Sequence, residues 1–169
     1  MVSIRCTKYS SDWKLLLLMW TNSLHRFNIS QPQELLSQKG NTSTITCSFT
    51  PPQDRDLLNI RIYWRAGSPR GAYAYHPNKE MIDPHYKDRT ELKGNLDLHI
   101  MNVQEEDETS YYCFVMLTLC TSPYNYKSVI DLGRGTKLTV TSKCTVLSYI
   151  AISALKCICH SASQYKTHS

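Results

Sequence analysis

The sequence predicts an all-β domain built as a sandwich of two antiparallel sheets. Strand-like segments with alternating polar and apolar residues follow one another between about residues 27 and 141, and turn residues separate them. No amphipathic helix of roughly ten or more residues lies between them, as parallel βαβ units would require. With 169 residues the chain is long enough for one domain with a core and short for two.

The predicted strands occur at the spacing typical of a sandwich or barrel. In chain order they span residues 44–49, 60–65, 72–75, 96–100, 111–117 and 137–140. Pro51-Pro52 ends the first of them, and Gly67-Ser68-Pro69 ends the second. Residues 118–132 are predicted to form a long loop that carries Cys120, Tyr124 and Tyr126.

The cysteine content indicates an oxidising compartment. Seven cysteines in a chain of this length are typical of secreted or extracellular proteins, and the odd number leaves at least one free or paired between chains. Cys120 and Cys144 are candidates for a second bridge, an intermolecular bridge or buried free thiols. Asn28 and Asn41 each begin an acceptor triplet for N-glycosylation, which fits the same compartment.

One ordered set of residues identifies the type of sandwich. Cys47 and Cys113 are separated by 66 positions with Trp64 between them, and Tyr111 stands two residues before the second cysteine. The segment 133–140, Gly-Arg-Gly-Thr-Lys-Leu-Thr-Val, follows near the end. Together these residues resemble an immunoglobulin V-set domain, so we expect a sandwich of that family with short termini outside it.

The resemblance implies roles for several residues. Cys47 and Cys113 would bridge the two sheets, with Trp64 packed on the sulfurs. On the chain-entropy model, a disulfide that closes a loop of this length stabilises a fold by roughly 4 kcal/mol. Tyr111 would bond through its hydroxyl to backbone upstream. Asp107 would face Arg89 in an ion pair.

The subfamily is indicated by shorter segments. Residues 47–52, 61–65 and 135–140 resemble the paired immunoglobulin-like type 2 receptors and the Siglecs. Ser30-Gln31-Pro32 adds similarity to the natural cytotoxicity triggering receptor with a single V domain. The resemblance covers residues 28–141 and implies an extracellular recognition domain of an immune-type cell-surface receptor, binding a protein or glycoprotein on another cell.

A departure concerns sialic acid. Siglec-like binders place an arginine just after the second cysteine, where its guanidinium pairs with the sugar carboxylate. This chain has Phe114 there, which has no such donors. Arg65 on a neighbouring strand is the alternative cation.

Strand alternation predicts the binding face. If Trp64 and Cys113 point inward, their neighbours in sequence point outward on the front sheet. Aromatic residues, methionine and arginine are enriched at protein interfaces. The predicted ligand-binding residues are Tyr63, Arg65, Tyr112, Phe114 and Met116, together with Tyr124 and Tyr126 of the loop. Homodimer packing or cover by that loop is the alternative use of this face, and a homophilic adhesion module or a secreted decoy is the alternative function.

Residues 1–26 resemble an incomplete signal segment. Lys14 precedes the apolar run 15–20, which is shorter than the usual hydrophobic region. Residues 142–169 are expected to form a stalk and a short apolar, cytoplasmic-like tail. The uncharged run 144–155 would reach ~18 Å as a helix, against a hydrocarbon core of ~30 Å. Lys156 could pair with an acidic residue of a membrane adaptor. The expected location is the cell surface, as a type I membrane protein, or secretion.

Other functions are disfavoured by composition and motif. The net charge is +5, but the basic residues are scattered, so no nucleic-acid partner is expected. His76, Glu80, Asp83 and His85 have no regular spacing, and no nucleophile elbow, phosphate loop or zinc-binding helix accompanies them. We therefore expect no enzyme activity, no cofactor and no metal site.

Overall fold

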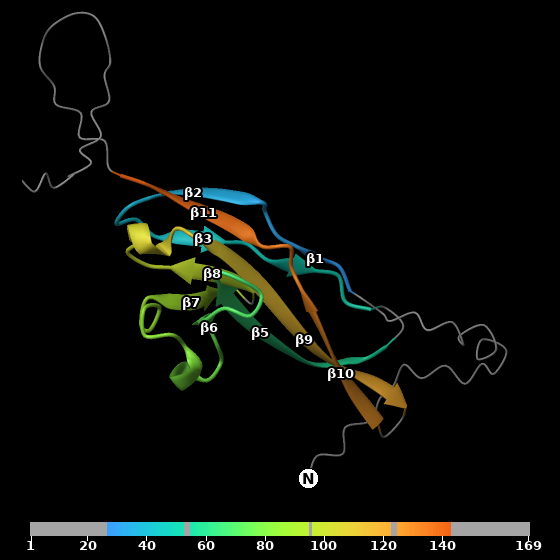
Figure 1. Cartoon of the computed structure of the whole chain (residues 1–169). Coiled ribbons are helices and arrows are strands. Elements are labelled where there is room, and N and C mark those ends of the chain that lie inside the picture. Colours follow the sequence, from blue (N-terminus) through green and yellow to red (C-terminus); the bar gives the residue numbers. More distant parts are fainter. Residues whose placement is uncertain (1–26, 53–54, 95, 123–124, 143–169) are drawn as a thin grey trace, which may run out of the picture.

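The computed structural model describes residues 27–52, 55–94, 96–122 and 125–142, which form a two-layer β-sandwich (Figure 1). Those residues contain eleven strands and only two short 3-10 helices, η1 (Lys79–Met81) and η2 (Glu105–Asp107). The predicted all-β sandwich is confirmed. The sequence forms strands because apolar residues recur at every second position, and such segments bury one face of a sheet.

The front sheet contains the longest strands. Its order is β2 (Glu34–Gln38), β11 (Thr136–Thr141), β9 (Ser110–Ser122), β5 (Leu57–Ala66) and β6 (Tyr73–Tyr75). The β2–β11 pairing is parallel, and the other pairings along this order are antiparallel. A final strand, β10 (Asn125–Leu132), pairs with the far part of β9.

The back layer consists of shorter strands. β3 (Ser43–Ile45), β8 (Asp97–Ile100) and β7 (Thr90–Lys93) form one group, while β1 (Ile29–Ser30) pairs with β4 (Ser48–Phe49). The strand expected over residues 44–49 is thus divided in two. The reason lies at Cys47, whose backbone N–H donates to the Asp97 carboxylate at 2.9 Å.

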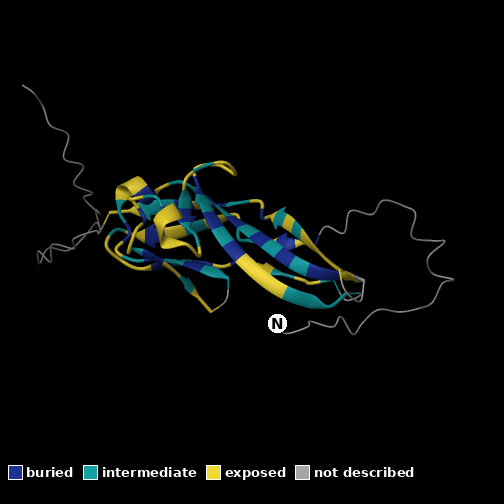
Figure 2. Ribbon diagram, turned by 90° about the horizontal axis from the view of Figure 1, so that it is seen from below, coloured by how far each residue is buried: buried dark blue, intermediate teal, exposed yellow. Residues whose placement is uncertain are grey.

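The core fills the space between the layers. From Ile62 to the end of β5, and along β9 as far as Leu119, buried residues alternate with half-buried ones, and Figure 2 shows the resulting bands along the ribbon. Trp64, Tyr111, Val115 and Leu117 are completely buried, as is Leu98 from the back layer. Burial of apolar surface on this scale is the dominant stabilising term of a sandwich.

The loop expected over residues 118–132 is wrong, because most of this segment is a β-hairpin. β9 continues to Ser122, and β10 returns beside it with Thr118 opposite Ser128 and Leu117 opposite Val129. Val129, Ile130 and Tyr126 favour extended backbone, and Leu117 and Leu119 continue the buried alternation of β9. In Figure 1 the hairpin projects beyond β7 and β8.

Some predictions fall on residues that are not described. The signal-like segment 1–26, the tail from residue 143 onward with Cys144 and Lys156, and Tyr124 all lie outside the described residues. Cys120 is 8% exposed and disulfide-bonded, so it is not a free thiol. Within the described ranges, no helix combines the length and apolar character needed to cross a bilayer.

Candidate functional site

Five of the predicted binding residues lie side by side on the outer face of the front sheet. The register of β5 and β9 places Tyr63 opposite Phe114, Arg65 opposite Tyr112, and Arg61 opposite Met116. The residues between them, including Ile62, Trp64 and Val115, are buried in the core. Tyr63, Arg65, Tyr112, Phe114 and Met116 are each half-buried, so part of every side chain contacts solvent.

β10 extends this face with apolar side chains. Leu132 lies opposite Phe114, and Ile130 lies opposite Met116. Ile130 is 59% exposed and Leu132 is 40% exposed. We call Tyr63, Phe114, Met116, Ile130 and Leu132 the front-sheet patch. Large apolar side chains gathered on one solvent-facing surface are typical of a protein interaction site.

The sequence analysis missed Ile130 and Leu132 because it treated their segment as a loop. The signal that could have found them is the run Tyr126 to Leu132, which is rich in residues that favour strands and contains no proline or glycine. Tyr126, which was predicted, is 71% exposed on the same strand.

Arg65 is held in place by its neighbours at the β6 side of the patch. Its guanidinium donates to the Gly71 carbonyl and to the Tyr73 hydroxyl, each at 2.6 Å, and stacks 3.8 Å from the centre of the Tyr73 ring. The rings of Tyr63, Tyr73 and His76 form a cluster with centroid distances of 4.7–6.3 Å. This edge of the patch is therefore aromatic and ordered, and part of the donor capacity of Arg65 is already used.

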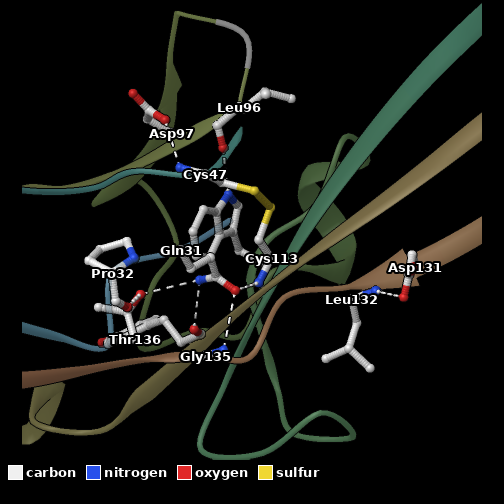
Figure 3. The surroundings of a disulfide bond; sticks show 12 residues. Gln31, Pro32, Cys47, Leu96, Asp97, Cys113, Asp131, Leu132, Gly135 and Thr136 are labelled. Atoms are coloured by element: carbon white, nitrogen blue, oxygen red, sulfur yellow. Dashed lines mark hydrogen bonds between the residues drawn. A yellow bond between two sulfur atoms is a disulfide. The ribbon is translucent and has the colours of Figure 1, made fainter. Parts of the chain in front are cut away.

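A disulfide joins the strand that carries Phe114 and Met116 to the back layer. Cys47 and Cys113 are bonded with their Cα atoms 6.5 Å apart, and Figure 3 shows this bridge between the layers. The buried Trp64 donates from its indole nitrogen to the Leu96 carbonyl at 2.9 Å. The two strands that carry most of the patch are therefore anchored directly to the core.

Gln31 fixes the path between β10 and β11. Its side-chain oxygen accepts from the backbone N–H of Cys113 at 3.2 Å and of Gly135 at 3.3 Å. Its amide nitrogen donates to the Tyr111 carbonyl and to the Thr136 hydroxyl. Figure 3 shows Gln31 between Cys113, Gly135 and Thr136. One side chain thus satisfies polar groups of two strands where the ladder is interrupted.

The two glycines next to this side chain have specific steric reasons. A Cβ at Gly133 would overlap the Gln31 side chain. Gly135 has a φ of +94°, and a Cβ there would approach a ring carbon of Tyr112 to 2.6 Å. The Gly-x-Gly pattern thus allows the chain to change direction between the end of β10 at Leu132 and the start of β11 at Thr136.

A buried carboxylate stabilises the turn before β9. Asp107 is fully buried and accepts from Arg89 through both oxygens, at 2.9 and 3.0 Å. It also accepts from the Gln104 backbone at 2.8 Å and lies 2.7 Å from the imidazole of His85. Burial alone would raise the pKa of Asp107, but the hydrogen bonds from Arg89, Gln104 and His85 together hold that pKa below its usual range.

Tyr111 belongs to the same region. Its hydroxyl donates to the Asp107 carbonyl at 2.9 Å and lies 3.3 Å from the Tyr86 hydroxyl. Burial raises the pKa of Tyr111, so the phenol stays neutral. The contact of His85 with Asp107 was not predicted, because the two residues are far apart in sequence. Among the described residues, no group of three or more His, Cys, Asp or Glu side chains is arranged to hold a metal ion.

These features define a class of protein. Two packed layers of strands, a disulfide between them, a buried tryptophan, and a tyrosine hydroxyl bonded to the preceding turn together make an immunoglobulin-type sandwich. The model of the immunoglobulin V-set domain family matches residues 30–141. The chain belongs to the immunoglobulin V-set family, a fold of receptor and adhesion proteins.

Relatives with this domain include immune proteins. The chain is 29% identical over 109 residues to "Selection and upkeep of intraepithelial T-cells protein 1" of Macaca fascicularis, covering 59% of this chain and 30% of that protein. It is 28% identical over 128 residues to "Paired immunoglobulin-like type 2 receptor beta-2" of Mus musculus, covering 72% and 55%. It is 24% identical over 97 residues to the human "ICOS ligand", covering 52% and 32%. The matches thus span about a third of the first and third proteins and about half of the second.

A solved structure shares the fold. The structure of murine CRIg superposes with a TM-score of 0.54 at 14% sequence identity, covering 69% of this chain and 98% of that one. This likeness concerns the fold alone. The predicted resemblance to the paired type 2 receptors has a counterpart among the relatives, whereas the similarities to Siglecs and to the natural cytotoxicity triggering receptor stay predictions.

Proposed function

We propose that this V-set domain is the extracellular recognition module of an immune-type cell-surface receptor, and that it binds a protein or glycoprotein on another cell through the front-sheet patch. The observation that carries the proposal is the patch itself, in which Ile130 and Leu132 expose 59% and 40% of their surface beside Phe114 and Met116. Isolated exposed apolar residues are ordinary, but a contiguous group favours a binding role.

The chemistry of the patch fits a protein surface. Its middle is apolar, and its β6 side offers the aromatic cluster of Tyr63, Tyr73 and His76 with Arg65 stacked upon it. Tyrosine, tryptophan and arginine are enriched among the few residues that dominate affinity at protein interfaces. We place the protein on the cell surface or in secretion, because the cysteines, the bridge between Cys47 and Cys113 and the related immune proteins all favour an oxidising compartment.

Binding to cells tests the proposal. A fluorescent tetramer of the full chain is applied to a panel of leukocyte and epithelial cells, and staining is measured by flow cytometry. Trypsin treatment of a stained cell type is expected to abolish staining, because the ligand contains protein. Sialidase treatment separates a glycan contribution from a purely protein contact.

Substitution then locates the contact. The double variant Tyr63→Ala, Phe114→Ala is expected to weaken staining by about 30-fold, which corresponds to ~2 kcal/mol for lost anchor residues. Met81→Ala is the matched control, because Met81 is 51% exposed but lies in η1, outside the front sheet. Unchanged staining by a correctly folded double variant would exclude the front-sheet patch as the site.

A further inference from the structure

β10 is an open edge of the front sheet. It pairs with β9 on one side and with no other strand in the described part of the chain. Six of its eight residues are exposed, it contains no proline, and its bulge lies at the tip, between Asn125 and Tyr126. Such an edge leaves backbone N–H and C=O groups available to another strand, except that the N–H of Leu132 already donates to Asp131. Lys127 and Asp131 are charged edge residues, which disfavour pairing with a strand whose charges do not complement them.

The side chains of β10 complement those of a second β10 that runs in the opposite direction. We propose that two copies of this chain pair through their β10 strands, with Val129 of one copy opposite Val129 of the other. Lys127 then lies opposite Asp131 of the second copy, and symmetry repeats this pair. Tyr126 faces Leu132, and Ser128 faces Ile130.

The charges select this register. No other antiparallel alignment of two β10 strands brings Lys127 directly opposite Asp131. Neither side chain forms an ion pair within the described residues. One oxygen of the Asp131 carboxylate accepts from the backbone N–H of Leu132 at 2.9 Å, so the second oxygen and the Lys127 ammonium are the groups offered to a partner. Opposite charges on facing strands stabilise a pairing, and like charges destabilise it. The backbone ladder supplies affinity, and the side chains supply specificity.

This pairing keeps the binding faces accessible. Facing residues of an antiparallel pair lie on the same side of a sheet, so the two-fold axis is perpendicular to the sheet. Ile130 and Leu132 of both copies therefore remain on one surface with the adjoining Phe114 side chains. The dimer presents two front-sheet patches side by side, which would raise avidity for a ligand displayed in many copies. The inference goes beyond the proposed function and does not require it.

Charge exchange tests the pairing in the full chain by analytical ultracentrifugation over a wide concentration range. The wild type is expected to dimerise reversibly. Lys127→Asp and Asp131→Lys are each expected to weaken self-association by about tenfold or more, because both symmetric pairs become like-charged. An equimolar mixture of the two variants, and the double variant that exchanges both charges, are expected to dimerise again. Lys87→Asp is the control, because Lys87 is exposed in the connection before β7.

A cross-link tests the register without altering Asp131, and therefore reports on the pairing even where Asp131→Lys does not fold. Val129→Cys is expected to give an intermolecular disulfide between two copies of position 129, identified by peptide mass spectrometry under mild oxidation. Ser128→Cys is the matched control, because position 128 faces position 130 instead of itself. Directly opposed Cβ atoms are about 4.5–5.5 Å apart, close to the range that a disulfide needs.

Two results would overturn the proposal. One is a wild-type chain that stays monomeric at every concentration. The other is a dimer that is insensitive to both charge variants and is lost in Tyr63→Ala, Phe114→Ala, which would mean that the copies pack face to face. The proposed function fails separately, because its test concerns binding by the front-sheet patch, and Lys127→Asp leaves that patch unchanged.

Discussion

Arg89→Met should be among the most damaging single substitutions in the domain. The Arg89 guanidinium donates to both oxygens of Asp107, at 2.9 and 3.0 Å, and that carboxylate is completely buried. Methionine retains much of the aliphatic packing but removes the charge. The carboxylate would then be left in the core without its strongest partner.

The expected cost is about 3 kcal/mol, the lower end of the range for breaking a buried ion pair. The lower end applies because Gln104 and His85 still contact the carboxylate, at 2.8 and 2.7 Å. A domain of this size has a total stability of roughly 5–15 kcal/mol, so the loss should be easily measured. Equilibrium urea unfolding at neutral pH, followed by tryptophan fluorescence with the disulfide intact, gives the free energy of unfolding.

A second substitution separates the charge from the packing. Adding Asp107→Asn to Arg89→Met should cost less than the sum of the two single changes, because a neutral amide does not need the guanidinium. Arg134→Met, at an exposed position between Gly133 and Gly135, should change stability by no more than about 0.5 kcal/mol. If the free energy of unfolding of Arg89→Met equalled that of the control, the ion pair between Arg89 and Asp107 would not stabilise the fold, and the reasoning would be refuted.

Three further predictions concern pH, backbone conformation and modification. The pKa of Asp107 in the folded protein lies below its unfolded value of about 3.9. The stability that Asp107 contributes is therefore present above that pH and is lost as the pH falls further. Asp107→Asn should consequently show a shallower decline of Tm than the wild type between about pH 4 and pH 2. Gly135→Ala should lower the free energy of unfolding by about 1–3 kcal/mol, because of the positive φ and the Tyr112 ring, and an unchanged urea midpoint would contradict this. Asn28 and Asn41 are exposed, so secretory expression should attach glycans that Asn→Gln variants lack, as intact mass would show.

The β9–β10 hairpin could not be predicted from the local pattern of residues alone. The sequence predicted a loop over residues 118–132, because this segment connects the last two predicted strands, 111–117 and 137–140. The structure forms strand through Ser122 and again from Asn125, since Leu117 and Leu119 remain buried and draw the segment into the front sheet. The sequence does not show that the core extends to Leu119. The alternating side chains of Tyr126, Ser128 and Ile130 could therefore not be assigned to one face of the sheet.

The part of the candidate site that lies on β5 and β9 was predicted from the sequence, and the part on β10 was not. Tyr63, Phe114 and Met116 lie beside core residues whose orientation follows from Trp64 and Cys113, so alternation alone places them on the outer face. Ile130 and Leu132 join them only through pairing with β9. The engagement of Arg65 by Gly71 and Tyr73 likewise depends on the β5–β6 turn and has no local signal.

The sequence by itself determined the fold family, because an inter-sheet disulfide, a buried tryptophan and a tyrosine before the second cysteine must be spaced to meet within one sandwich. Only the tertiary structure decided that the last connection is a hairpin, that His85 reaches Asp107, and that Gln31 supports Gly135. Those contacts join residues that are distant along the chain. Their formation depends on how the two layers pack, and no local periodicity encodes that packing.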